Sequence, residues 1–253
     1  MVEVRISTPR GVTLAGTFEP GPGSAAVLFV HGFLADRRSA GVFDVLAERY
    51  REAGYATLQL DLSGCGASED DVITVAGEVE DLRSASDWLT EQGYPVQALH
   101  AHAFGALAAL RAQPPAVVTM VLTDPVTGPM HYPWEEIFAP GQLEELDTHG
   151  FTRIPDDNDG AREYTVISKT TLADYSLIDQ AELLGGLRVP VLVVHSYGDD
   201  GATELVDLSR EGLPLLPAGS RLEVLEAADR PGQDRVDAVA ELALAWLAAH
   251  LPA

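Results

Sequence analysis

Five short segments of this sequence are almost continuously apolar, and segments with helical spacing separate them. The apolar runs are AAVLFV (25–30), YATLQLD (55–61), residues 96–101, VVTMVLTD (117–124) and VPVLVVHS (189–196). A run of this length without a polar face is typical of a strand buried on both sides of a parallel sheet. Residues 40–53 and 77–92 have the pattern of helices between such strands. The alternation predicts an α/β fold with a mostly parallel, twisted sheet that helices cover on both faces.

The two ends of the chain extend this pattern. Residues 2–8 and 11–18 alternate like the strands of a hairpin, and residues 221–227 and 236–250 are expected to form the last strand and the last helix. A chain of 253 residues with 46% hydrophobic content can bury one substantial core. We therefore expect a single domain over residues 1–253.

One segment breaks the alternation. Residues 125–187 fill the space where a simple crossover helix would suffice, and they mix aromatic residues with prolines, glycines and acids. We interpret this segment as an inserted cap over the carboxyl ends of the strands, the edge at which open α/β sheets bind ligands. Substrate choice is therefore expected to depend on this cap.

Charge and cysteine content exclude several classes of partner and site. The chain has 39 acidic and 16 basic residues and a formal charge of −23, so we expect neither nucleic acid nor a membrane surface as a partner. Cys65 is the only cysteine, which excludes an internal disulfide and a multi-cysteine metal site. The histidines lack ligand spacing, and we expect no metal and no cofactor. Without an apolar signal core or a membrane-length apolar run, the protein is expected to be cytoplasmic.

The pentapeptide AHAFG at 101–105 joins a strand-like run to the helix-like run 104–112. With its flanks, the chain resembles the α/β-hydrolase superfamily over essentially its whole length, in which G-x-S-x-G forms the nucleophile elbow. The matching segments, in order, are VLFVHGF (27–33), DLSGCGAS (61–68), AHAFG, HSYGDD (195–200) and LEAADRPG (225–232). Residues 151–190 most resemble the small-lid branch that contains cinnamoyl-type esterases.

The resemblance implies a degenerate catalytic triad. It aligns Ala103, Asp199 and Arg230 with the serine, the acid and the histidine. A methyl group cannot attack a carbonyl, and an arginine does not deprotonate in a protein, so it cannot replace the imidazole base. We favour natural loss of the triad over an engineered substitution. Arg230 opposite Asp199 is either a structural ion pair or an anchor for an anionic substrate group.

The resemblance also implies that the backbone N–H groups of Phe33 and Phe104 form an oxyanion hole, which depends on the loops and not on the serine. Asp124 ends a strand and is either a general base or the cap of the next loop. His131 begins the cap and is a candidate acid–base group or part of an exposed loop. The catalytic candidates are thus Asp199, Asp124, His131 and Arg230.

The substrate pocket is expected to include residues from the two loops after the strands and from the cap. The candidates are His31, Leu34, His102, Tyr132, Trp134 and Tyr197. His31 and His102 also suit the roles of a loop-stabilising residue and a packing residue. Cys65 is expected to be a buried, inert thiol.

Three functions are compatible with these residues. The first is a non-hydrolytic lyase or cyclase that uses the oxyanion hole for elimination, decarboxylation or cyclisation. The second is a serine hydrolase inactivated at Ala103 or using an unrecognised nucleophile, and the third is a non-catalytic small-molecule-binding pseudohydrolase. The first is our expectation. Degenerate relatives of this kind occur among tailoring enzymes of bacterial natural products such as polyketides, and a chain whose only lysine is Lys169 suits a high-GC bacterial source. The expected partner is a small-molecule substrate. A homodimer is compatible with the sequence, which does not set the oligomeric state.

Overall fold

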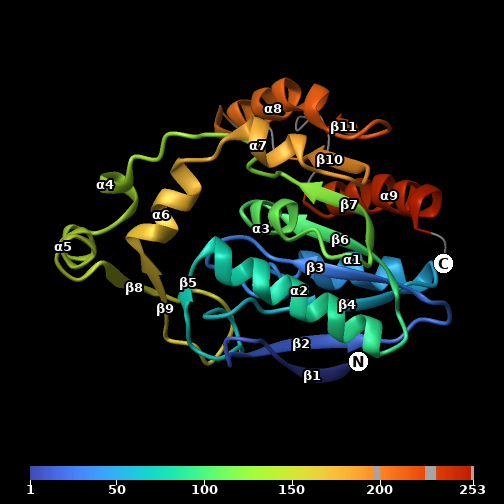
Figure 1. The fold of residues 1–253 in the computed structure, drawn as a ribbon, viewed down its shortest axis with the longest axis horizontal. Helices are drawn as coiled ribbons and strands as arrows, with labels where there is room; N and C mark the ends of the chain where they lie inside the picture. Colours follow the sequence, from blue (N-terminus) through green and yellow to red (C-terminus); the bar gives the residue numbers. More distant parts are fainter. Residues whose placement is uncertain (197–199, 226–231, 252–253) are drawn as a thin grey trace.

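An eight-stranded sheet forms the centre of the computed structural model, which describes residues 1–196, 200–225 and 232–251 (Figure 1). In spatial order its strands are β1 (Val2–Ser7), β2 (Thr13–Glu19), β4 (Ala56–Leu60), β3 (Ala25–Val30), β6 (Val96–His102), β7 (Val117–Thr123), β10 (Val191–His195) and β11 (Arg221–Val224). The pairs β1–β2 and β2–β4 are antiparallel, and the other neighbours are parallel. The predicted, mostly parallel sheet is confirmed, and the carboxyl ends of β3, β6, β7 and β10 meet at one edge.

Helices cover both faces of this sheet, as the sequence predicts. The helices α1 (Val42–Glu52) and α9 (Gly232–His250) pack on one face, and α2 (Val75–Glu91) and α3 (Gly105–Ala112) pack on the other. Strand β3 shows why its run is apolar throughout: Ala26, Leu28 and Val30 belong to the α2/α3 side, while the residues between them belong to the α1/α9 side. The helix α8 (Asp200–Gly212) and the short 3₁₀ turn η1 (Leu213–Leu215) precede β11.

Helix boundaries differ from the predicted ones by a few residues, for local reasons. The helix α2 begins at Val75 because the side chain of Thr74 accepts a hydrogen bond from the Gly77 amide, which is an N-cap contact. The helix α1 begins only after Gly41, whose φ of +85° is outside the helical region. None of the helices within the described ranges is long and apolar enough to cross a lipid bilayer.

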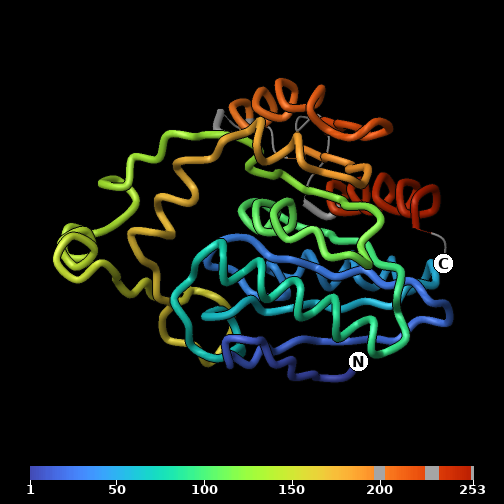
Figure 2. Tube along the Cα trace, viewed as in Figure 1, coloured from blue at the N-terminus to red at the C-terminus, as the bar shows by residue number. Residues whose placement is uncertain are grey.

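The cap segment, residues 125–187, contains its own small sheet. Its elements are α4 (Trp134–Ile137), α5 (Pro140–His149), β8 (Phe151–Pro155), β9 (Tyr164–Ser168), α6 (Lys169–Ser176) and α7 (Gln180–Gly185). Strand β9 pairs with β8 and also with β5 (Val72–Ile73), which lies far away in the sequence. The trace in Figure 2 leaves the central sheet after β7, extends to one side of it and returns through α6 and α7. The sequence indicated an insertion here but not this three-stranded sheet.

Two polar side chains of the cap, Arg162 and Asn158, form hydrogen bonds to the loops around the sheet edge. The guanidinium of Arg162 donates to the Gly66 carbonyl over 3.0 Å and contacts Asp70 over 2.6 Å. The amide of Asn158 donates to the Leu34 carbonyl over 2.8 Å. The β8–β9 loop of the cap is therefore bound to the loops that follow β4 and β3.

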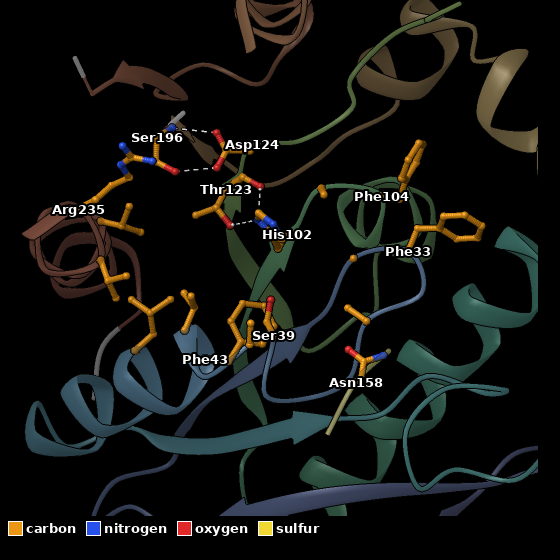
Figure 3. Close-up of a pocket in the computed structure, with 18 residues that line it drawn as sticks. Phe33, Ser39, Phe43, His102, Phe104, Thr123, Asp124, Asn158, Ser196 and Arg235 are labelled. Atoms are coloured by element: carbon orange, nitrogen blue, oxygen red, sulfur yellow. Dashed lines mark hydrogen bonds between the residues drawn. The ribbon is translucent and has the colours of Figure 1, made fainter. Parts of the chain in front are cut away.

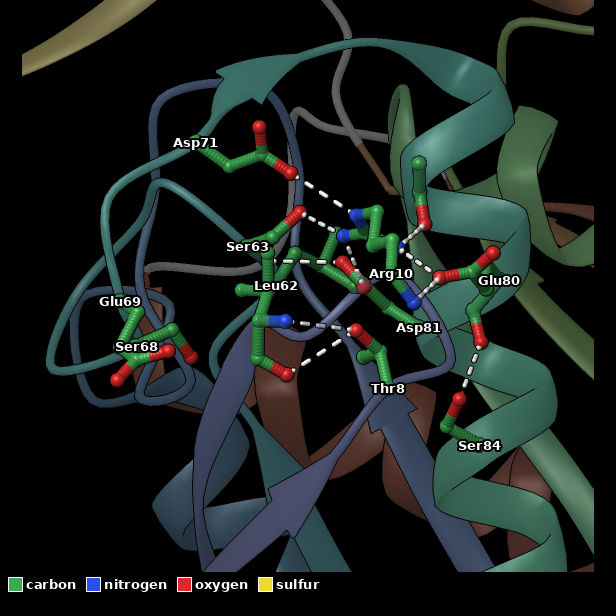
Figure 4. Close-up of polar contacts among 12 residues, drawn as sticks. Thr8, Arg10, Leu62, Ser63, Ser68, Glu69, Asp71, Glu80, Asp81 and Ser84 are labelled. Carbon is green, nitrogen blue, oxygen red and sulfur yellow. Dashed lines mark hydrogen bonds and ion pairs between the residues drawn. The ribbon is translucent and has the colours of Figure 1, made fainter.

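Arg10 holds the loop after β4 from the opposite side. Its guanidinium contacts Asp71 and Glu80 over 2.9 Å each and the fully buried Asp81 over 2.5 Å (Figure 4). Burial alone would lower the pKa of Arg10, but these carboxylates outweigh that effect and raise the pKa. Because Asp81 also accepts from the Ser63 amide over 2.8 Å, this ion cluster joins the hairpin, the loop and α2.

A buried carboxyl group lies where the cap meets α2. Glu78 is buried in the first turn of α2, and its Oε2 has no hydrogen-bond partner among the described residues. The hydroxyl of Tyr175, from α6 of the cap, is also buried without a partner there. Burial, with smaller contributions from Asp81 and Asp174, raises the pKa of Glu78 from 4.5 to about 8.

This shift predicts a pH-dependent stability that Glu78→Gln removes. An acid whose folded pKa is raised contributes its full stability below pH 4.5, and that stability is lost as the pH rises to about 8. Glu78→Gln is neutral at every pH, so its stability should rise relative to the wild type by up to about 1.4 kcal/mol per pH unit in this window. Urea unfolding at several pH values measures the difference. Glu91→Gln, at the exposed end of the same helix, is the control, and a difference for Glu78→Gln that stays constant with pH would contradict the assignment.

Candidate active site

A sharp turn joins β6 to α3, with Ala103 at its tip. Ala103 has a φ of +49°, in the left-handed region that residues other than glycine rarely adopt. A Cβ added at Gly105 would lie 2.1 Å from the carbonyl oxygen of His31, so only glycine fits there. A Cβ added at Gly32 would lie 3.3 Å from the Ala103 Cβ. The backbone of the turn therefore packs directly against the backbone of the loop after β3, next to the Ala103 methyl group.

His31 fixes the shape of the loop after β3. The Leu62 amide donates to His31 Nε2 over 3.0 Å, so Nε2 carries no proton and Nδ1 donates to the Gly32 carbonyl over 2.8 Å. The ring is buried and does not line the cavity described next. The structure thus places this predicted pocket residue in a supporting position beneath the loop.

A cavity of about 690 Å³ opens beside this turn, at the carboxyl ends of the strands. One end is polar and is formed by His102, Thr123, Asp124, Ser196 and Arg235 (Figure 3). The apolar wall comes from α1 and α9 and consists of Val42, Phe43, Leu46, Val236 and Val239. Gly32, Phe33, Ala103 and Phe104 line the side nearest the turn, and Asn158 reaches the cavity from the cap. The cavity can therefore hold a molecule with one polar end and an apolar body.

Asp124 is held as a carboxylate at the polar end. Its two oxygens accept hydrogen bonds from Ser196, from the amide over 2.8 Å and from the hydroxyl over 2.7 Å. The His195 Nδ1 lies 3.6 Å from Asp124 Oδ1. Burial alone would raise the pKa of Asp124, but His195, Ser196 and the more distant His102 outweigh it and place the pKa below its ordinary value. Asp124 is therefore a stable negative charge and a weak base.

His102 stands next to Ala103 and lines the same polar end. Its Nδ1 lies 3.1 Å from the Thr123 carbonyl oxygen and 3.2 Å from the Thr123 hydroxyl. Burial lowers the pKa of His102, and the charge of Asp124 opposes this only in part. The imidazole is therefore neutral at neutral pH.

Phe33 and Phe104 both line the cavity. Neither backbone N–H group has an acceptor among the residues that the structure describes, and both residues lie beside the Ala103 methyl group. Figure 3 shows their rings on the side away from Asp124 and Ser196. Backbone amides without an acceptor are the groups that the predicted oxyanion hole requires, because their dipoles are fixed before a ligand binds.

The rings of Phe33 and Phe104 pack against the cap. Ring centroids lie 5.1 Å apart for Phe33 and Tyr175, 4.0 Å for Phe104 and Tyr175, and 5.7 Å for Phe104 and Tyr132. Trp134 stacks on Tyr132 at 4.8 Å. We call these five residues the aromatic cluster. It fills the space between the turn and the cap, so Tyr132 and Trp134 lie in packing positions outside the cavity lining.

Other predicted site residues lie elsewhere. His131 is exposed, and Leu34 contacts the cap through its carbonyl; neither lines the cavity. Asp199, Arg230 and Tyr197 lie outside the described residues. Ser196, Arg235 and Asn158 line the cavity but were not predicted, because no local pattern marks them. Cys65 is buried, and burial raises the pKa of its thiol. In the described ranges, no group of three or more His, Cys, Asp or Glu residues is arranged to hold a metal ion.

The contact at Gly105 predicts a large effect of a single methyl group. Gly105→Ala should lower the free energy of unfolding by about 3 kcal/mol or more, because the new Cβ overlaps the His31 carbonyl and the backbone on both sides is packed. Gly141→Ala is the matched control. Gly141 lies in α5 with no atom near its Cβ position, so that change should stabilise the protein by about 0.5–1 kcal/mol. Urea unfolding compares the two, and an equal effect would contradict the described turn.

Comparison with solved structures finds the same fold in other proteins. The alpha/beta hydrolase GrgF from Penicillium sp. sh18 superposes with a TM-score of 0.78 at 18% identity over 99% of this chain and 98% of that chain. DcsB, in complex with its substrate analogue, superposes with a TM-score of 0.74 at 17% identity, over 96% of this chain and 97% of that chain. A thermophilic esterase from Thermogutta terrifontis superposes with a TM-score of 0.68 at 21% identity, over 98% of this chain and 99% of that chain. These identities establish the fold alone.

Sequence comparison identifies the family. No curated protein matches the chain. A sequence model of the alpha/beta hydrolase family matches residues 27–165, which is more than half of the chain and includes most of β3, the loop after it and the turn at Ala103. This match shows that the chain belongs to the alpha/beta hydrolase family.

Proposed function

We propose that this protein is a non-hydrolytic enzyme, a lyase or cyclase, that stabilises an enolate or a polarised carbonyl at the amides of Phe33 and Phe104. One observation carries the proposal: the strained turn, and two amides without an acceptor among the described residues, lie around a methyl group instead of a nucleophile. A group at the polar end of the cavity would remove the proton. Such a reaction needs an oxyanion site and a base, but no nucleophilic side chain.

Serine hydrolysis fits these residues poorly. It requires a hydroxyl nucleophile and an imidazole that takes its proton. The hydroxyl of Ser196 donates to Asp124 over 2.7 Å, but a carboxylate whose pKa is below its ordinary value is a weak base for a serine. The hydroxyl of Thr123 lies 3.2 Å from His102 Nδ1, but this nitrogen also lies 3.1 Å from the Thr123 carbonyl oxygen, which can only accept, so Nδ1 carries a proton and cannot take the one from the hydroxyl. Neither group supplies the pair that acyl transfer needs.

The cavity supports a substrate with a carbonyl at one end and an apolar body. Its volume of about 690 Å³ suits a medium-sized molecule, and its α1/α9 wall is apolar. Removing one donor from an oxyanion hole typically costs a factor of about 10²–10³ in rate, so two amides can carry much of the acceleration. An acyl intermediate of bacterial natural-product biosynthesis, such as a polyketide, has this chemical shape. The relative DcsB, solved with a substrate analogue, supports the idea that this fold accommodates small organic molecules.

A proton-exchange assay tests the proposal without the natural substrate. Phenylacetone in D₂O has α-protons whose exchange proceeds through an enolate, and NMR follows it directly. We expect the wild type to accelerate this exchange above a bovine serum albumin control. Asp124→Asn should slow it, because the variant lacks the negative charge that stabilises a protonated base in the cavity.

The hydrolase alternative is tested in parallel with 4-nitrophenyl acetate and butyrate. Neither the wild type nor Ala103→Ser should hydrolyse these esters above background. Ester hydrolysis by Ala103→Ser, with no exchange by the wild type, would show an inactivated hydrolase. Absence of both activities, with phenylacetone bound in the cavity by NMR, would overturn the enzyme proposal in favour of a binding protein.

A further inference from the structure

We propose that His102 is the catalytic base, accepting the substrate proton at Nε2. This inference rests on the proposed function and adds to it the atom that receives the proton. We infer it from the hydrogen bonds of the His102 ring, from the position of the ring near Phe33 and Phe104, and from the negative charge of Asp124.

The hydrogen bonds of His102 fix its tautomer. Nδ1 lies 3.1 Å from the Thr123 carbonyl oxygen, which can only accept, so Nδ1 carries the proton and donates it. The Thr123 hydroxyl, 3.2 Å from Nδ1, uses its own proton towards the Ala101 carbonyl over 3.4 Å. Both neighbours of Nδ1 are therefore acceptors. Nε2 must then hold an unshared electron pair, and it makes no hydrogen bond to the described residues.

The Cδ2 side of the His102 ring lies next to the loop that carries Phe33. A Cβ built at Gly32 would be 3.7 Å from His102 Cδ2, the atom bonded to Nε2, and 3.3 Å from the Ala103 Cβ. Gly32 directly precedes Phe33, one of the two residues whose amides form the site. The imidazole lines the cavity with these residues, and Figure 3 shows it between the polar end and the turn. A base in this corner can reach a carbon next to a carbonyl held by the amides.

The charges around His102 suit proton transfer. Burial lowers the pKa of His102 and keeps the ring neutral before reaction, while Asp124, at the end of β7, stabilises the imidazolium that forms. Arg235 lines the same cavity from α9. His100, two residues earlier on β6, is fully buried; burial, with a smaller contribution from His102, lowers its pKa to about 3, so it adds no charge.

The proton and the electrons balance in one step. The C–H bond next to the substrate carbonyl breaks, its proton moves to Nε2, and its electron pair forms an enolate whose oxygen lies at the two amides. In elimination, the enolate expels a leaving group, and the imidazolium returns the proton to that group. In cyclisation, the enolate carbon attacks a second carbonyl, whose oxygen takes the proton. In the exchange assay, the ring exchanges its proton for a deuteron and returns the deuteron to carbon.

Substitution of His102 tests the base role in the exchange assay. His102→Gln should slow phenylacetone exchange by about 100-fold, the lower range for a general base. His102→Ala should be equally slow and should recover with added imidazole, a rescue that a purely structural role would not produce.

The wild-type rate should fall as the pH is lowered through the pKa of His102, because protonation removes the base. His149→Gln, an exposed histidine at the end of α5, is the matched control. Unchanged exchange in His102→Gln would overturn the assignment.

Nitrogen NMR separates this inference from the proposed function. In protein labelled with ¹⁵N-histidine, the His102 signals, assigned by their loss in His102→Gln, should show a neutral ring with the proton on Nδ1. A proton on Nε2 would overturn the base role even if exchange is observed. Exchange that survives in both His102 variants would remove His102 and leave the proposed function standing. No exchange by the wild type would overturn both.

Discussion

The contact between Gly105 and the carbonyl of His31 is the constraint on which the site depends. With no room for a Cβ at Gly105, α3 begins directly against the loop after β3, and the chain between β6 and α3 must turn within two residues. Ala103 accordingly takes a φ of +49°, a strained conformation that the packed surroundings impose. The amides of Phe33 and Phe104 are positioned by this backbone contact. This backbone does not require a serine side chain, so the oxyanion hole that we propose at these amides is compatible with a methyl group at position 103.

The turn lies between the aromatic cluster and the cavity. On the cap side, the rings of Phe33 and Phe104 pack against Tyr175. Tyr175 itself does not line the cavity. On the other side, α1 and α9 form the apolar wall, and the carboxyl ends of β6 and β7 supply His102 and Asp124. Among the described residues of the cap, Asn158 lines the cavity. The apolar part of the described lining comes largely from α1 and α9.

The sequence predicted the central sheet well because its strands carry local signals. Continuous apolar runs marked the buried strands, and helical spacing marked the layers on both faces. The cap sheet was missed because β8 and β9 become strands only by pairing with each other and with the distant β5. At the site, Phe33, Ala103, Phe104, His102 and Asp124 line one cavity because each lies at or beside a strand end. Arg235 and Asn158 reach it from segments without such a marker, and the packing roles of Tyr132 and Trp134 depend on contacts that spacing does not encode.

We propose that two backbone amides stabilise a negative oxygen in the absence of a nucleophile. A titration of ¹⁵N-labelled protein with a series of substituted phenolates measures this directly, because each phenolate presents one charged oxygen of known basicity. We expect the amide-proton signals of Phe33 and Phe104 both to move downfield, and to move further for more basic phenolates. Binding that shifts the signals of the cavity wall, at Val236 and Val239, while both amides stay unchanged would contradict it.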